Sequence, residues 1–159
     1  MLADDIGRLN AVARTVARAA LQRLEHEVLE ARDGESAWEI LRRHEEVRVI
    51  VSDWVMPQGD GLELCRRVRG AGRPDYQYFI LVTGRDDSEE NRMAAADAGV
   101  DDFLTKPLHL SELWMRLRVA EQWVDRFGQV AGLAAAREPA DRLRGAGFAD
   151  PDDERGGLD

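Results

Sequence analysis

The chain has few of the residues on which several classes of protein depend. Its only cysteine is Cys65, which excludes an internal disulfide and a zinc site built from several thiolates. No apolar run approaches the length of a membrane span, and the first residues lack the charged-then-apolar pattern of a secretory signal. We therefore expect a soluble protein that resides in the cytoplasm and does not insert into a membrane.

Positive charge is also scarce relative to negative charge. Among 159 residues, 31 are acidic and 22 are basic, which gives a formal net charge of −9. This balance argues against a nucleic acid or an anionic membrane surface as the main partner. Every basic side chain except Lys106 is an arginine. A chain of this length can bury one sizeable core, so we expect one domain with an appendage.

Short apolar runs alternate with stretches of helical periodicity. Runs at 47–51 and 78–82, a weaker one at 28–31 and a last one at 100–105 are typical of strands. Helical spacing of apolar residues lies before or between them, at 9–24, 37–41, 64–68 and 93–96. This alternation predicts an α/β fold, a doubly wound parallel sheet with helices on both faces.

A longer helical pattern begins near Leu110. Apolar residues recur at spacings of three and four as a heptad seam: Leu110, Leu113, Leu117, Ala120, Val124, Phe127, Ala131 and Ala134. Two interpretations stay open. The helix either wraps on its own domain, with Gly128 and Gly132 fraying its end, or it pairs with a partner helix, such as that of a second copy. We predict a domain over 1–127, a helical extension over 128–137 and an acidic, disordered tail over 138–159.

Polar residues follow the predicted strands at the points where each strand ends. They are Asp4-Asp5, then Asp53, Thr83 and Lys106. In an open parallel sheet, ligands bind beyond the carboxyl ends of the strands, so these side chains should converge at one edge. Alone, each residue is more typical of a turn, a cap or a solvated charge. Their joint placement is a much more specific signal.

The chemistry of this set favours phosphoryl transfer. Carboxylate oxygens suit Mg²⁺, and a carboxylate beside Mg²⁺ can act as a nucleophile that forms an aspartyl phosphate. A point-charge donor and a hydroxyl donor, Lys106 and Thr83, would bind the remaining phosphoryl oxygens.

Three segments carry a family resemblance: "VIVSDWVMPQGDGLELCRRVR", "FILVTGRDD" and "AAADAGVDDFLTKPL". Together they resemble the receiver domain of bacterial two-component response regulators, in particular the chemotaxis receiver, from about Asn10 to Phe127. The resemblance implies a flavodoxin-like sheet of five strands. It also implies a signalling module rather than an enzyme, limited to phosphotransfer onto its own Asp53 and slow loss of that group.

The resemblance assigns roles to individual residues. Asp53 would accept a phosphoryl group from a histidine kinase or a phosphotransfer protein, assisted by Thr83 and Lys106. Mg²⁺ would be bound by Asp53, by Asp5 and by the backbone carbonyl of Val55, and Asp4 would support this set without binding the ion directly.

Phe103 falls at the switch aromatic of the family and would rotate inward when Thr83 moves, which changes the surface offered to a downstream effector protein. An ordinary half-buried strand aromatic is the alternative, since the commoner residue there is Tyr.

The N-terminus departs from the family pattern, because only Met1, Leu2 and Ala3 precede the acidic residues. Either residues after Asp5 form an insertion and Asp4-Asp5 are the acidic pair, or the register is ungapped and Arg8-Leu9 occupy those positions. The second case predicts a degraded Mg²⁺ site and a different function: a docking or dimerisation module that acts without phosphorylation. Neither case includes a DNA-binding output, since no basic helix-turn-helix pattern follows.

Overall fold

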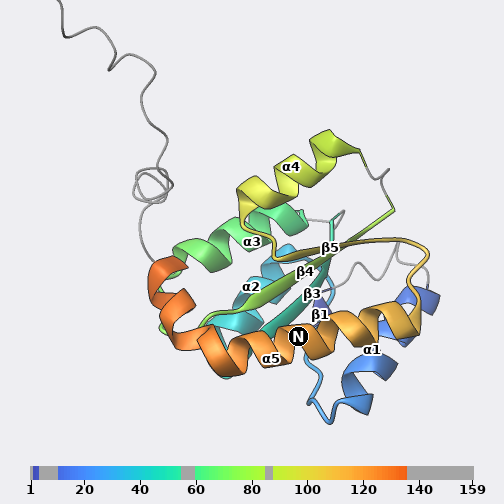
Figure 1. Cartoon of the computed structure of the whole chain (residues 1–159), viewed down its shortest axis with the longest axis horizontal. Helices are drawn as coiled ribbons and strands as arrows, with labels where there is room; N and C mark the ends of the chain where they lie inside the picture. The colour runs from blue at the N-terminus through green and yellow to red at the C-terminus, as the bar shows by residue number, and fades with distance from the viewer. Residues whose placement is uncertain (1, 4–10, 55–59, 85–87, 136–159) are drawn as a thin grey trace, which may run out of the picture.

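The computed structural model describes residues 2–3, 11–54, 60–84 and 88–135. Five parallel strands form one sheet in the order β2-β1-β3-β4-β5 (Figure 1). The elements in chain order are β1 (Leu2–Ala3), α1 (Ala11–Arg23), β2 (Glu30–Ala31), α2 (Gly34–Arg43), β3 (Val49–Asp53), α3 (Gly61–Gly70), β4 (Tyr78–Thr83), α4 (Glu89–Ala98), β5 (Asp102–Thr105) and α5 (Leu110–Ala135). The predicted doubly wound α/β fold, with its very short first strand, is confirmed.

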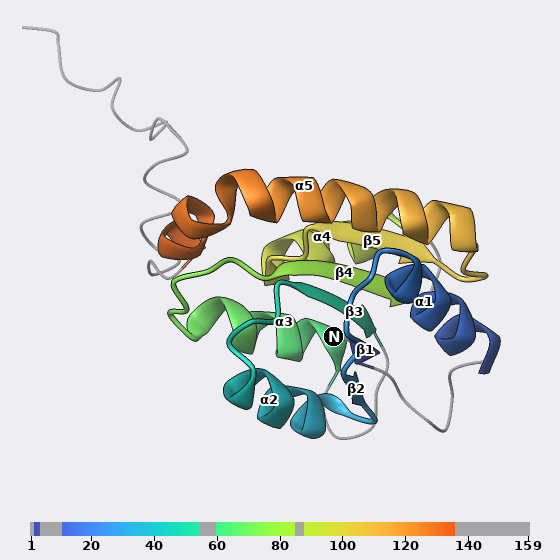
Figure 2. The same cartoon turned by 90° about the horizontal axis from the view of Figure 1, so that it is seen from below.

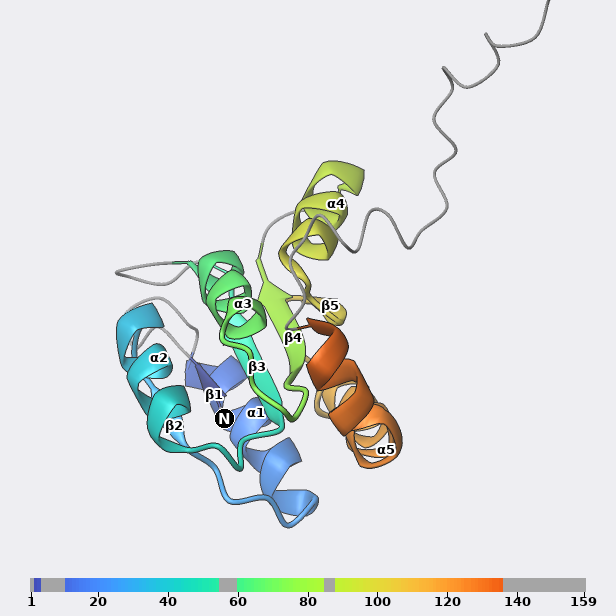
Figure 3. The same cartoon turned by 90° about the vertical axis from the view of Figure 1, so that its left-hand side faces the viewer.

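Helices cover both faces of the sheet (Figures 2 and 3). Alternate residues of the central strands point to opposite faces, as the pleat requires. Ile50, Phe79 and Leu81 pack with α2, α3 and α4, whereas Val51 and Ile80 pack with α1 and α5. Because both faces are buried, the central strands are continuous apolar runs, which is the pattern that identified them.

The strand boundaries differ from those predicted. β3 begins at Val49 rather than Val47, since the N–H of Val47 donates to the carbonyl oxygen of His44 in the turn after α2 (3.3 Å). At its other end β3 continues through Asp53, which pairs with Val82. Asp53 and Thr83 are thus the last residues of their strands rather than the residues that follow them.

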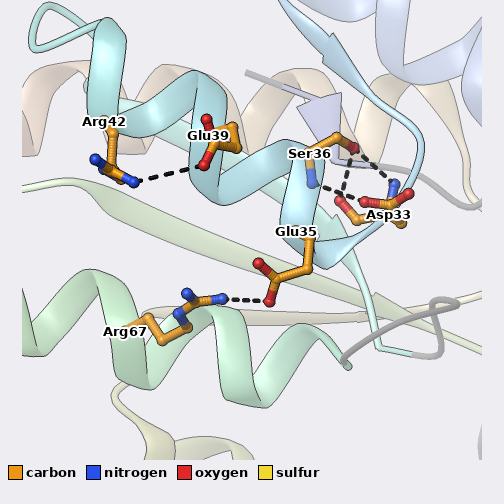
Figure 4. Close-up of polar contacts among 6 residues, drawn as sticks. All are labelled: Asp33, Glu35, Ser36, Glu39, Arg42 and Arg67. Atoms are coloured by element: carbon orange, nitrogen blue, oxygen red, sulfur yellow. Dashed lines mark hydrogen bonds and ion pairs between the residues drawn. The ribbon is translucent and has the colours of Figure 1, made fainter.

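Polar contacts fix the start of α2 and its position beside α3 (Figure 4). The Asp33 side chain accepts from the N–H of Ser36 (2.7 Å), and the Ser36 hydroxyl accepts from the N–H of Asp33 (3.2 Å). This capping box satisfies backbone donors that the first helical turn leaves unpaired. In the same first turn, Glu35 of α2 accepts from Arg67 of α3 (2.7 Å).

The long helix uses its seam within its own domain. Leu113, Leu117, Ala120 and Val124 are buried against α1 and the sheet, while Phe127 is 53% exposed. The helix does not fray at Gly128. It continues to Ala135, and the Gly128 carbonyl accepts from the N–H of Tyr76 (3.0 Å). Gly128, the first residue of the predicted extension, is therefore hydrogen-bonded to the chain segment that enters β4. The predicted tail, 138–159, lies outside the described residues.

Cys65 lies in the core. It is fully buried between α3 and the sheet, and this burial raises the pKa of its thiol to about 12. Such a thiol stays protonated and behaves as a small apolar side chain.

No helix in the described ranges has the length and apolarity to cross a membrane.

Gly61, the first residue of α3, permits the closest approach between a helix and the sheet edge. A Cβ atom at this position would lie 2.3 Å from the carbonyl oxygen of Asp53 and 2.9 Å from Cδ1 of Leu81. Neither neighbour can yield, because the first is backbone and the second belongs to a fully buried residue. Only glycine lets α3 begin directly against the end of β3.

We predict that Gly61→Ala lowers the free energy of unfolding by about 1–3 kcal/mol, the usual cost of overpacking. Gly70→Ala in the same helix is the matched control, since a Cβ there meets nothing within 4 Å. It should be neutral or stabilising by up to about 1 kcal/mol. Urea denaturation followed by circular dichroism measures both. Equal stabilities of the two variants would contradict the steric account.

Candidate functional site

The described site centres on an ion pair at the carboxyl edge of the sheet. Nζ of Lys106 lies 2.8 Å from Oδ2 of Asp53. The Asp53 side chain is 5% exposed and that of Lys106 is 21% exposed. A carboxylate this deeply buried needs a compensating charge, and Lys106 supplies it from the loop after β5. The two residues are 53 positions apart in the sequence, so the sheet topology alone brings them together.

Thr83 joins this edge from β4, the strand between β3 and β5. It is completely buried, and its carbonyl oxygen accepts from the N–H of Lys106 (2.8 Å). The ladder sets Asp53 beside Val82 and Thr83 beside Thr105. Asp53, Thr83 and Lys106, predicted from the strand ends, therefore lie at the ends of three neighbouring strands, at one edge of the sheet.

The backbone after Asp53 is held by two hydrogen bonds. The N–H of Trp54 donates to the carbonyl oxygen of Val82 (3.0 Å), and the Trp54 carbonyl accepts from the N–H of Gly61 (2.8 Å). The chain that leaves Asp53 is thus fixed to β4 on one side and to the start of α3 on the other. These contacts limit how far the carboxylate can shift.

Phe103, the predicted switch aromatic, lies on β5 and contacts Trp54. The two rings meet edge to face, with centroids 6.1 Å apart and an interplanar angle of 85°. Trp54 is 4% exposed, and Phe103 is half-buried against the same core cluster. This geometry is typical of a stabilising aromatic pair. It links the residue after Asp53 to the strand that leads to Lys106.

The predicted Mg²⁺ ligands other than Asp53 lie outside the described residues. These are Asp4, Asp5 and the Val55 carbonyl, and the alternative pair Arg8-Leu9 lies outside as well. Within the described ranges, no group of three or more His, Cys, Asp or Glu side chains could hold a metal ion. The register of β1 is described, and it sets Leu2 beside Val51 and Ala3 beside Ser52. Ala3, the residue before Asp4, therefore lies beside Ser52, the residue before Asp53.

One cluster of functional groups was missed by the sequence analysis. Asp101, directly before β5, binds Arg69 of α3 and Tyr76 before β4. A carboxylate in a glycine-containing loop is typical of a turn, and nothing in the sequence pairs it with an arginine 32 positions earlier. This cluster lies at the amino edge of the sheet, opposite Asp53.

Comparison with known proteins gives a consistent result. The family model described as "Response regulator receiver domain" matches residues 2–118. A chemotaxis protein CheY homolog of Campylobacter jejuni is 38% identical over 95 residues, which are 59% of this chain and 72% of that protein. The response regulator MprA of Mycobacterium leprae is 43% identical over 88 residues, 55% of this chain and 37% of MprA.

Solved structures agree with the sequence comparison. The Francisella response regulator 1452 receiver domain superposes with a TM-score of 0.64 at 29% identity, over 76% of this chain and 93% of that one. The chemotaxis response regulator CheY4 of Vibrio cholerae superposes with a TM-score of 0.65 at 25% identity, over 75% and 95% of the two chains. The predicted resemblance is confirmed: this chain belongs to the receiver domain family of two-component response regulators.

Proposed function

We propose that the chain is a receiver that accepts a phosphoryl group on Asp53 and thereby switches a protein-binding surface. The observation that carries this proposal is the buried Asp53 carboxylate paired with Lys106 at 2.8 Å, with Thr83 at the end of the strand between them. The donor is a histidine kinase or a phosphotransfer protein, and the receiver of the signal is a downstream effector protein. Exchange with such a kinase implies a cytoplasmic location.

The reaction follows from the groups present. A carboxylate oxygen of Asp53 attacks the phosphorus atom, and the P–N bond of the donor phosphohistidine breaks as its electron pair returns to the imidazole nitrogen. Lys106 then exchanges part of its contact with Asp53 for a phosphoryl oxygen, since its ammonium is a compact point charge. The hydroxyl of Thr83 donates to another oxygen of the group. The step places one phosphoryl group on the chain's own Asp53, which fits a switch better than an enzyme that turns over a substrate.

The residues present fit a magnesium ion at this edge. Asp53 supplies one carboxylate, and the register of β1 supports Asp5 as the second, with Asp4 beside it and the Val55 carbonyl as a further oxygen ligand. A strand β1 that is already level with Ser52 at Ala3 favours Asp4-Asp5 over Arg8-Leu9 as the pair that follows the strand. When bound, Mg²⁺ would neutralise charge on the phosphoryl oxygens.

The switch would run through Phe103. Movement of Thr83 toward the phosphoryl group opens space behind β4, and Phe103, already in contact with Trp54, turns further inward. The two arrangements differ in the surface around β5, so a partner that prefers one of them shifts the equilibrium.

We predict that the chain gains one phosphoryl group when it is incubated with acetyl phosphate and Mg²⁺, measured by intact mass. Asp53→Asn should gain none, because an amide is not a nucleophile for this step. Lys106→Ala should retain the site but react at least about tenfold more slowly, since it loses a charge at the reacting centre. Asp33→Asn, at the cap of α2, is the matched control and should react like the unchanged chain. An unmodified mass at saturating donor would contradict the proposal.

Titration with Mg²⁺ distinguishes the two readings of the N-terminus. We predict that Trp54 fluorescence changes on Mg²⁺ addition, because Trp54 directly follows Asp53 in the chain. We also predict that Asp5→Asn weakens binding by at least about tenfold through loss of a ligand charge. Trp54→Phe identifies which of the four tryptophans reports. An unchanged Mg²⁺ affinity in Asp5→Asn would instead support a degraded acidic pair and a module that docks without phosphorylation.

The alternative dimerisation function would use α5, whose described part extends past the end of the family match at residue 118. Among the α5 side chains that the structure describes, the exposed large apolar residues are Met115, Val119 and Phe127. The seam residues Leu113, Leu117, Ala120 and Val124 already pack inside the domain. We therefore predict a monomeric mass for the unphosphorylated chain in light scattering. A dimer that Phe127→Glu converts to a monomer would favour the alternative.

A further inference from the structure

Asp101 stands at the start of β5 and accepts hydrogen bonds from three separate parts of the fold. Its Oδ2 accepts from Nη2 of Arg69 (2.7 Å) and from the backbone N–H of Phe79 (2.8 Å). Its Oδ1 accepts from the hydroxyl of Tyr76 (2.5 Å). The donors belong to α3, to β4 and to the segment that leads into β4. One carboxylate thus joins the start of β5 to α3, to β4 and to the segment before β4.

Arg69 is built into this network rather than exposed on α3. Its side chain is 8% exposed, its Nε donates to the Gly99 carbonyl (3.0 Å) and its Nη1 donates to the Gln77 carbonyl (2.7 Å). Its guanidinium carbon lies 4.3 Å from the centroid of the Tyr76 ring. A buried arginine needs a carboxylate partner, so removal of Asp101 would leave an uncompensated charge in the fold.

The position of β5 makes this network consequential. β5 is the last strand in the sheet order, so within the sheet it pairs with β4 alone. Phe103 lies on β5, and Lys106 directly follows its last residue. At the start, the N–H of Asp101 donates to Phe79 (3.0 Å), and at the end the N–H of Lys106 donates to Thr83 (2.8 Å). The N–H of Phe79 in turn donates to the Asp101 carboxylate, so two hydrogen bonds join Asp101 to Phe79 at the start of β5.

We infer that Asp101 is a positioning residue for the phosphoacceptor site: its contacts with Phe79, Arg69 and Tyr76 fix β5 against β4 and so place Lys106 on Asp53. A register error in a strand moves every side chain to a new neighbour, and an edge strand held from one side needs a specific anchor. This inference rests on the proposed phosphorylation for its catalytic consequence, but not for its structural one.

Burial opposes this arrangement, and the donors offset it. Desolvation raises the pKa of the Asp101 carboxyl, whereas Arg69, Tyr76 and the N–H of Phe79 act to lower it. The same desolvation raises the pKa of the Tyr76 hydroxyl. The Tyr76 hydroxyl therefore keeps its proton at neutral pH and acts as the donor to Asp101.

Asp102 offers a matched control one residue away. Its carboxylate accepts from the N–H of Phe103 on its own strand (2.9 Å) and lies 3.5 Å from Arg116, whose side chain is 48% exposed. Among the described residues, its carboxylate forms no hydrogen bond or ion pair with α3 or β4, so its removal should leave the position of β5 unchanged.

The experiment compares Asp101→Ala, Asp101→Asn and Asp102→Ala in the full chain, at a temperature where circular dichroism shows each to be folded. Phosphorylation by acetyl phosphate should be about tenfold slower in Asp101→Ala, since a displacement of about 1 Å at a reacting group costs up to roughly a hundredfold. Asp101→Asn should recover part of the rate, because its amide oxygen still accepts from Phe79. Asp102→Ala should react like the unchanged chain.

Two further readouts separate positioning from general loss of structure. Amide hydrogen exchange at Lys106 should accelerate in Asp101→Ala, while Mg²⁺ affinity should not fall, because the proposed ligands follow β1 and β3 and the displaced Lys106 is a cation. If Asp101→Ala fails to fold, Tyr76→Phe, which removes one donor, replaces it with a smaller expected slowing. A folded Asp101→Ala with unchanged rate and unchanged Lys106 exchange overturns the inference, as does an equal loss of Mg²⁺ affinity. If the unchanged chain accepts no phosphoryl group, the proposed function fails, and exchange at Lys106 alone decides the inference.

Discussion

The ion pair between Asp53 and Lys106 is the constraint on which the rest of the carboxyl edge depends. A carboxylate with 5% of its side chain exposed is stable only beside a matched cation, and the distance of 2.8 Å shows a direct contact. The contact requires β3, β4 and β5 to lie in parallel and in register, so that residues far apart in sequence finish at one edge. Lysine suits this place, because a small ammonium can share its charge between Asp53 and a bound anion.

The packing of the sheet serves the same edge. Gly61 lets α3 begin within contact of the Asp53 backbone, and Trp54 continues the chain into the core, where it meets Phe103. The opposite edge contains the Asp101 network, which anchors the strand that delivers Lys106. The two edges are therefore coupled through β5, a strand of only four residues.

Much of the site could be predicted from the sequence because its geometry is local to strand ends. Asp53, Thr83 and Lys106 each follow or end an apolar run, and the parallel topology of the sheet brings these strand ends to one edge. The exact ends of the strands could not be predicted, since hydrogen bonding continues through polar residues such as Ser52 that periodicity treats as loop. Of the predicted heptad seam of α5, Leu113, Leu117, Ala120 and Val124 are buried and Phe127 is exposed. Periodicity cannot say whether a domain or a second copy covers such a seam. The structure shows the domain covering its described central part.

The Asp101 network shows a different limit. Its members are brought together by tertiary packing at separations of 22 to 32 residues, and each has an ordinary local explanation in the sequence. The acidic pair is a third case, because the register of β1 supports Asp4-Asp5 while both residues lie outside the described ranges.

The presence of a single lysine allows the central claim to be tested directly. Selective ¹⁵N-lysine labelling gives one backbone resonance, that of Lys106, in a heteronuclear NMR spectrum of the whole chain. The account predicts that this resonance shifts when Mg²⁺ and acetyl phosphate are added together, and that it does not shift in Asp53→Asn under the same conditions. A Lys106 resonance that stays in place while the mass shows a phosphoryl group on the chain would contradict it.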